Sequence, residues 1–255
     1  MQTKKLATDD RVSFVMTEWC NYLCKHCMRG TRRRNHISEE VIDSVLEQIQ
    51  LQGEVFLTGG EPLLYMDKVK YLLGQLEYYS YSPSRIVVIT NGSIAPDKFR
   101  EFIRMVKHCY FIPQVLVSND YFHYLERKRL NDDVDFIHDR MEEYWKIMKE
   151  FDFVDYTFDT LLLEHYAMGM ADGRGVAAIG RGKKIEGAYY SHRNFDLSPG
   201  AYLEGDRIVG EIEITTDGRI IPSIDASWQE MDEHYGQDHN CLNRPIRRIL
   251  DPNNR

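Results

Sequence analysis

Three of the five cysteines lie within eight positions near the start of the chain, in the segment CNYLCKHC. Their spacing is Cys20-x3-Cys24-x2-Cys27, and the other two, Cys109 and Cys241, lie far away and apart. Thiolates are soft ligands that suit zinc, copper(I) or an iron–sulfur cluster. A 4Fe–4S cluster normally takes four cysteine ligands, so three would leave one iron open to a small molecule. An open coordination position indicates catalysis.

Two other interpretations of the triplet remain open from the sequence. A structural zinc site usually takes four ligands in two pairs, so His26 or His36 would have to complete it. Alternatively, the three cysteines are unrelated. Residues 1–11 contain no apolar stretch typical of a signal peptide, and no apolar run approaches the roughly 20 residues of a membrane-spanning helix. We therefore expect a cytoplasmic protein without a membrane partner. In the reducing cytoplasm, clustered cysteines serve as metal ligands or catalytic groups instead of forming disulfides.

The composition is ordinary for a globular protein, with 43% hydrophobic and 28% charged residues. The net charge is −8, from 32 basic and 40 acidic residues. This balance argues against general nucleic-acid binding, although a local basic patch stays possible. The 255 residues suffice for one large domain, or for one domain with an appendage.

The segments that must position the cysteines alternate between short apolar runs and amphipathic stretches. Ser38 is a suitable N-cap for one helix, and Pro96 suits the first turn of another. Repeated strand–helix units predict a parallel sheet with helices packed outside it. Five or six units fall short of the eight of a closed barrel, so we expect an α/β fold, a partial (β/α)6 TIM-like barrel. The predicted strands are 11–17, 54–58, 84–90, one within 110–120, and 152–158; the predicted helices are 38–51, 66–80, 96–109 and 132–151.

The pattern changes after about residue 160. A segment rich in glycine and basic residues, 168–184, is predicted to form an ordered loop. Residues 207–225 form the clearest hairpin, with Asp217-Gly218 at the turn, and 244–250 is predicted to be a short basic helix. We therefore expect a partial-barrel domain over 1–184 and a C-terminal extension, with the hairpin and the terminal helix, over 185–255.

Together these motifs resemble those of the radical S-adenosylmethionine (radical SAM) superfamily. The cysteine triplet resembles its cluster motif, and TGGEP, residues 58–62, looks like its GGEP motif. ITNGS (89–93) and VSND (117–120) follow the third and fourth strands, where the family carries similar polar turns. The resemblance covers about residues 11–180, and the first two motifs carry most of it.

The resemblance implies both cofactors and a reaction. Cys20, Cys24 and Cys27 would ligate a 4Fe–4S cluster whose open iron binds S-adenosylmethionine. Reductive cleavage of that compound would yield a 5′-deoxyadenosyl radical, which abstracts hydrogen from a substrate. An electron donor such as flavodoxin or ferredoxin would be required. The cofactors supply the difficult chemistry, while the protein supplies position and excludes water.

The resemblance also implies a set of cofactor-binding residues. Gly59 and Gly60 would let the chain pass close to the ligand, and Glu61 would face the amino group of the methionine moiety. The backbone at His26 would touch adenine, although the family more often has Tyr or Phe there. Without the cysteines, these polar motifs would be interpreted as plain turns and helix caps. The remaining predicted cofactor contacts are Thr90, Asn91, Ser93, Ser118 and Asp120.

Four residues are candidates for the substrate site. His123 follows the VSND motif at the carboxyl end of a strand, where barrel folds place their chemistry. Arg29, just before the arginines at 32–34, and Arg181, in the glycine-rich loop, suit phosphate or carboxylate groups; the alternative is a solvated loop. Cys241 is a candidate hydrogen donor to a substrate radical.

The C-terminal hairpin resembles the opening of the SPASM extension of peptide-modifying family members. Ser223 stands where that extension usually has a cluster-binding cysteine, so we expect a single cluster and a degenerate extension. A peptide, modified as in RiPP biosynthesis, is therefore the predicted substrate. The alternatives are radical modification of a nucleoside, nucleotide or other small anionic metabolite, a glycyl-radical activase, and a non-enzymatic zinc-binding interaction module.

Overall fold

The computed structural model describes residues 4–118, 120–130, 136–151, 157–161, 181, 184, 201–221 and 226–251. Its larger sheet has seven strands in the order β11-β10-β2-β4-β5-β6-β7, and only the β10–β11 pair is antiparallel. Parallel strands joined by helices are the predicted α/β arrangement, and the sheet stays open over the described residues, as a partial barrel does. The strands are β2 (Val12–Thr17), β4 (Glu54–Gly59), β5 (Arg85–Thr90), β6 (Pro113–Ser118), β7 (Thr157–Leu161), β10 (Ile212–Ile214) and β11 (Ile220–Ile221).

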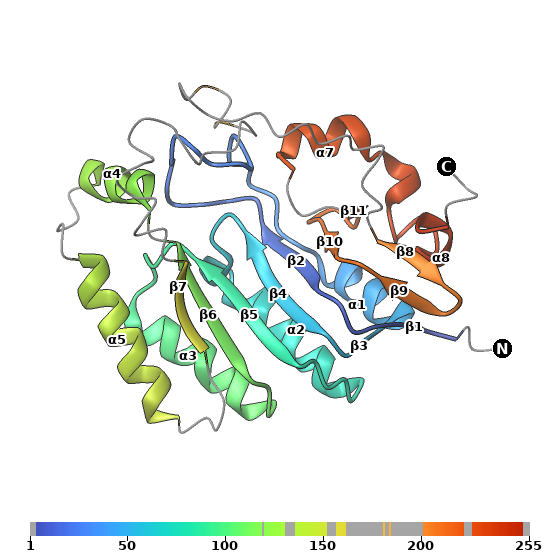
Figure 1. The fold of residues 1–255 in the computed structure, drawn as a ribbon, viewed down its shortest axis with the longest axis horizontal. Coiled ribbons are helices and arrows are strands. Elements are labelled where there is room, and N and C mark those ends of the chain that lie inside the picture. The colour runs from blue at the N-terminus through green and yellow to red at the C-terminus, as the bar shows by residue number, and fades with distance from the viewer. Residues whose placement is uncertain are drawn as a thin grey trace.

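Three helices, α1 (Glu39–Gln48), α2 (Met66–Tyr78) and α3 (Pro96–His108), connect these strands and cover one face of the sheet (Figure 1). Alternation along β2 separates the two faces of the sheet. Phe14 and Met16 are fully buried in the core with the helices, whereas Ser13 lines a cavity on the other face. Ser38 caps α1 as predicted, because its side chain accepts a hydrogen bond from the amide of Val41.

The prediction that the first helix continues to residue 51 was wrong. Residues Ile49–Leu51 form strand β3, which pairs in parallel with β1 (Leu6–Thr8). β1 also pairs with β9 (Arg207–Val209), which pairs with β8 (Tyr202–Glu204), so a second sheet has the order β3-β1-β9-β8. Pairing with a distant segment therefore overrides the helical pattern at the end of α1.

The sequence also failed to predict helix α4 (Tyr121–Arg129), which precedes α5 (Phe136–Glu150). Glu126 and Arg127 of α4 are buried, so the helix does not show the simple division into an apolar and a charged face that reveals most helices. Asp120 caps α4 by accepting hydrogen bonds from the amides of Phe122 and His123. The fifth strand, β7, includes residues 157 and 158 of the predicted 152–158 and continues to Leu161, whereas residues 152–156 lie outside the described residues.

The predicted hairpin is confirmed around Asp217-Gly218, where Gly218 has a φ of +89° between β10 and β11. Its first predicted residues belong instead to β9 in the smaller sheet. β10 pairs in parallel with β2, so the hairpin extends the main sheet (Figure 1). The domain boundary after residue 184 stays a prediction. Ser223 and most of 168–184 lie outside the described residues.

Three short helices end the described chain. They are α7 (Trp228–His234), the 3-10 helix η4 (Gln237–His239) and α8 (Ile246–Ile249), and α8 confirms the predicted basic helix; another 3-10 helix, η1 (Pro62–Leu64), follows β4. Across the described residues, no helix combines the length and apolar character needed to cross a membrane.

Candidate cofactor-binding site

A cavity of about 360 Å³ lies at the carboxyl ends of β2, β4, β5 and β6. Parallel strands bring these ends to one edge of the sheet, where ligands of open α/β folds bind. Most of the predicted site residues therefore meet there, although their motifs are separated in sequence. The predicted residues that line the cavity are Cys20, Cys24, His26, Cys27, Arg29, Gly59, Gly60, Thr90, Asn91, Ser118, Asp120, His123 and Arg181.

The three cysteines share this cavity as free thiols. Burial, and then the nearby Glu61 carboxylate, raise the pKa of Cys20 to about 12. Burial also raises the pKa of Cys24, whose side chain packs with Tyr22 and Phe122. The amide of Tyr22 and the Asn91 Nδ2 each lie 3.4 Å from Cys20 Sγ and donate hydrogen bonds to it.

These features fit an iron–sulfur cluster. Three soft donors converge on one cavity, and two N–H groups already point at one of the sulfurs, as they would at a thiolate. A coordinating metal deprotonates a thiol outright and so removes the penalty that burial places on the charged form.

Asn91 and Ser93 hold the start of the cysteine loop. Asn91 Nδ2 donates to Asn21 Oδ1 at 3.0 Å, and Asn21 Nδ2 donates to Ser93 Oγ at 2.8 Å. The amide of Leu23 donates to Glu126 Oε1 at 2.8 Å. Ser93 does not line the cavity, so its contribution among the described residues is to the position of the loop.

At Gly59 and Gly60, the end of β4 passes very close to the backbone of the residues that precede Cys20. Gly59 has a φ of +124°, and a Cβ there would lie 2.1 Å from the Thr17 carbonyl oxygen. A Cβ on Gly60 would lie 2.0 Å from the Trp19 carbonyl oxygen. The glycines are therefore required by close backbone packing, in addition to any approach of a ligand.

Glu61 is fully buried and is not among the cavity-lining residues. Its carboxylate accepts hydrogen bonds from the Thr90 hydroxyl and from the amides of Asn91 and Leu63. Burial raises the pKa of Glu61 to about 7, against these hydrogen bonds. Glu61 therefore joins the ends of β4 and β5, and its contact with the methionine amino group stays a prediction.

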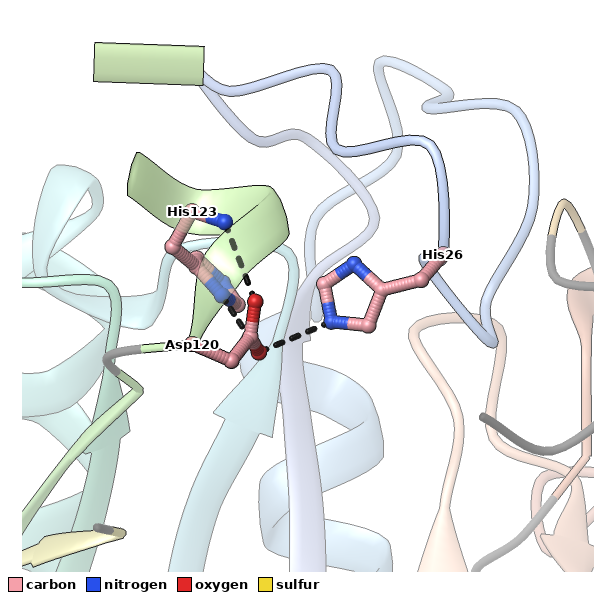
Figure 2. Close-up of side chains that lie close together, drawn as sticks. All are labelled: His26, Asp120 and His123. Carbon is pink, nitrogen blue, oxygen red and sulfur yellow. Dashed lines mark hydrogen bonds and ion pairs between the residues drawn. The ribbon is translucent and has the colours of Figure 1, made fainter. Parts of the chain in front are cut away.

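His26, Asp120 and His123 form a hydrogen-bonded cluster (Figure 2). Asp120 Oδ2 lies 2.9 Å from His26 Nε2 and 2.8 Å from His123 Nδ1. Burial alone would raise the pKa of Asp120, but hydrogen bonds from His123 and His26 lower it well below its usual range. His26 also stacks on Phe122, with ring centroids 4.7 Å apart. The cluster ties the cysteine loop to the start of α4.

Several site residues were not found by sequence reasoning. Arg127 is 2% exposed, and its guanidinium interacts electrostatically with Tyr22, Asp120 and Cys24. Glu213 of β10 and Trp228 of α7 also line the cavity. No local pattern marks these residues, because each reaches the site only through the tertiary fold.

Two cysteines lie elsewhere. Cys241 is 4% exposed and packs in the main core, where its carbonyl accepts a hydrogen bond from Ser44 on α1. It is not among the described residues that line the cavity, and its role as a hydrogen donor stays a prediction. Cys109 follows α3 and is partly exposed.

The fold and the thiol-lined cavity define a class of protein. The sequence profile described as the radical SAM superfamily matches residues 14–149, more than half of the 255-residue chain. The chain belongs to the radical SAM superfamily, whose enzymes use a 4Fe–4S cluster and S-adenosylmethionine. The resemblance read from the cysteine and GGEP motifs is thereby confirmed.

Two relatives and one solved structure are similar to the chain. It is 34% identical over 104 residues to the putative L-lysine 2,3-aminomutase of Aquifex aeolicus (strain VF5), covering 35% of this chain and 26% of that protein. It is 25% identical over 103 residues to the S-adenosylmethionine-dependent nucleotide dehydratase of Selenomonas ruminantium, covering 36% of each. The chain thus matches about a quarter to a third of these relatives' length. Native anSMEcpe with bound AdoMet matches with a TM-score of 0.55 at 14% identity, covering 93% of this chain and 79% of that one, which shows the fold alone.

Proposed function

We propose that this chain cleaves S-adenosylmethionine reductively and abstracts hydrogen from a peptide. The observation that carries this proposal is that three thiols, Cys24 buried and Cys20 and Cys27 half-buried, converge on a cavity walled by the ends of four parallel strands. When bound, the cluster and S-adenosylmethionine supply the one-electron cleavage of a carbon–sulfur bond. A flavodoxin or ferredoxin is the electron donor in this proposal.

The chain's own residues bind and orient in this reaction. Cys20, Cys24 and Cys27 hold the cluster, and the N–H groups of Tyr22 and Asn91 stabilise the Cys20 thiolate. Backbone atoms near Gly59 and Gly60 approach the methionine moiety.

Ser118 and Asp120 contact the ribose or the methionine carboxylate, and the backbone at His26 contacts adenine. Thr90 and Ser93 act through the groups they hold, since Thr90 donates to Glu61 and Ser93 accepts from Asn21. His123 and Arg181 remain for the substrate.

A peptide is favoured over an anionic metabolite by the charges of the cavity wall. Arg29 was a candidate for binding phosphate, but its guanidinium is paired with Glu213 and also donates to the carbonyl of Ala226. The hairpin that resembles a SPASM opening supplies Glu213, so the C-terminal strands help to form the substrate side of the cavity.

Nucleotide modification is the second candidate. One relative is named a nucleotide dehydratase, and Arg11, Arg32 and Arg181 also line the cavity. Buried Arg181 Nε finds no hydrogen-bond partner among the described residues, so it is available to an anionic group.

The first experiment tests the cluster and the cleavage. Anaerobically reconstituted protein should bind about four irons with matching sulfide, and reduction with S-adenosylmethionine should release 5′-deoxyadenosine. Cys24→Ala should abolish that release, whereas Cys241→Ala, the matched control, should retain it. One zinc without sulfide, or undiminished cleavage by Cys24→Ala, would refute the proposal.

The second experiment separates the substrate classes. Deuterated peptides and deuterated nucleotides are offered in turn, and transfer of deuterium into 5′-deoxyadenosine is measured by mass spectrometry. Transfer from peptides alone supports the proposal, and transfer from nucleotides alone selects the second candidate.

A further inference from the structure

Arg29, two residues after Cys27, is held by the C-terminal part of the chain. Its Nη1 donates to Glu213 Oε1 at 2.8 Å and to the carbonyl of Ala226 at 3.0 Å, and its Nη2 donates to Glu213 Oε2. The Arg29 side chain is 9% exposed and that of Glu213 is fully buried. Two parallel charge-assisted hydrogen bonds fix orientation as well as distance, so the guanidinium has one permitted position.

The backbone of Arg29 is fastened to the same region. Its carbonyl accepts a hydrogen bond from the amide of Trp228 at 3.1 Å, and its guanidinium carbon lies 5.1 Å from the centre of the Trp228 ring. Arg29 is therefore attached at both its side chain and its backbone to two segments about 200 positions later in the sequence.

The attachment reaches Cys27 through a short turn. The amide of Gly30 donates to the carbonyl of Cys27 at 3.1 Å, and the amide of Cys27 donates to the carbonyl of Cys24 at 3.2 Å. This turn restricts the movement of Arg29 relative to Cys24 and Cys27. A displacement of Arg29 would therefore move Cys27 relative to Cys24.

We propose that the Arg29–Glu213 pair is a positioning device, which holds Cys27 at the distance from Cys20 and Cys24 that one cluster requires. Strand β10 thereby sets the geometry of a loop near the other end of the sequence. Arg29 and Glu213 are positioning residues, because they act through Cys27.

A second ion pair between the same segments provides a matched control. Arg33 Nη2 lies 2.7 Å from Asp232 Oδ2 on α7, but these side chains are 34% and 45% exposed. Exposed pairs contribute little to rigidity, and this one lies further from the cysteines. Asp232→Asn should therefore leave Cys27 unaffected.

The test measures the thiols of the full-length, cluster-free reduced protein. Iodoacetamide alkylation is followed at each cysteine by mass spectrometry, a readout that requires neither cluster nor cofactor and so is independent of the proposed function. Glu213→Gln should raise the alkylation rate of Cys27 on the order of tenfold, the scale of the coupling between residues in direct contact. Cys109 and Cys241 should keep their rates. In reconstituted enzyme, the same variant should lose its cluster absorbance to a chelator about tenfold faster.

A double variant separates positioning from folding. Arg29→Met with Glu213→Leu replaces the pair by apolar side chains, a change that buried ion pairs often tolerate without loss of stability. The proposal expects wild-type thermal unfolding with faster Cys27 alkylation and faster cluster loss. Wild-type rates in this variant would overturn the proposal. Equal acceleration at all cysteines, or failure of the double variant to fold, would also overturn it by showing that the pair serves only the fold.

Discussion

Replacing Gly60 with alanine should displace the first cluster ligand. A Cβ at this position would lie 2.0 Å from the Trp19 carbonyl oxygen, 2.3 Å from its carbon and 2.9 Å from the Cys20 amide nitrogen. Real contacts of this kind stay beyond 3.0 Å, so the Trp19 carbonyl must retreat by at least 1 Å, the difference between 2.0 and 3.0 Å. Metal ligands tolerate about 0.2 Å. The required displacement is therefore several times larger than the cluster site accepts.

The same displacement should lower stability. The Trp19 carbonyl accepts a hydrogen bond from the amide of Glu61 at 2.9 Å, which the shift would break. Overpacking and one lost hydrogen bond together predict a loss of about 3 kcal/mol in the free energy of unfolding, or roughly 10 °C in Tm. Gly74→Ala is the matched control, because a Cβ there meets nothing within 4 Å in helix α2. It should raise stability by about 0.5–1 kcal/mol and leave the cluster intact.

Iron and sulfide content after anaerobic reconstitution, with circular dichroism against temperature, would measure both effects. Gly60→Ala should retain a folded spectrum and less than half of the wild-type iron. If it binds iron like Gly74→Ala and unfolds at the wild-type temperature, the close approach of β4 to residues 19–20 does not determine where Cys20 lies.

Three further predictions concern buried polar groups. Burial raises the pKa of Glu61 from 4.5 to about 7, so the stability that its protonated form contributes is present below about pH 4.5 and is lost as the pH rises to 7. At 1.36 kcal/mol per pH unit, the loss in the free energy of unfolding is about 3 kcal/mol. Urea unfolding of Glu61→Gln should not show this dependence on pH, and pH curves parallel to those of the wild type would contradict the prediction. Asp120→Ala should weaken the cap of α4 by about 1 kcal/mol and S-adenosylmethionine binding on the order of tenfold, as calorimetry would show; unchanged affinity would remove Asp120 from the cofactor site. Tyr22→Phe should cost about 1–2 kcal/mol in urea unfolding, because the buried Arg127 guanidinium loses its electrostatic interaction with the Tyr22 hydroxyl. Tyr78→Phe, at a residue 77% exposed, should cost nothing, and equal effects of the two changes would show that the interaction of Tyr22 with Arg127 does not stabilise the fold.

Local patterns predicted the central strands and the helices between them. The strands at 12–17, 54–59 and 85–90 are apolar runs bounded by polar or turn residues, and α3 begins at Pro96 as its sequence indicates. The three-residue strand β1 was missed, because it pairs with β3 about 40 residues later and with β9 about 200 residues later. No window of sequence contains both partners.

The residues of the site also fall into those that a local sequence pattern predicts and those that it does not. That the three cysteines and the two glycines lie at one cavity could be predicted, because each motif is short and its residue types suit one chemistry. Glu213 resembles any polar residue in a half-exposed strand, yet it is fully buried against Arg29. Arg127 stands among Lys128 and Arg129 in a stretch that suggests a solvated helix. Charges are costly to bury unless paired, so a sequence pattern assigns them to the surface.

The place of β2 between β4 and β10 has a consequence for biosynthesis. The ribosome makes the strand that leads into the cysteines early, but its neighbour on one side is translated about 200 residues later. At typical elongation rates that interval lasts roughly 10 to 40 seconds. During it, one edge of β2 is unpaired and can pair with wrong partners. The newly made thiols can meet the machinery that delivers iron and sulfide before Glu213 and Trp228, which contact the loop at Arg29, are made.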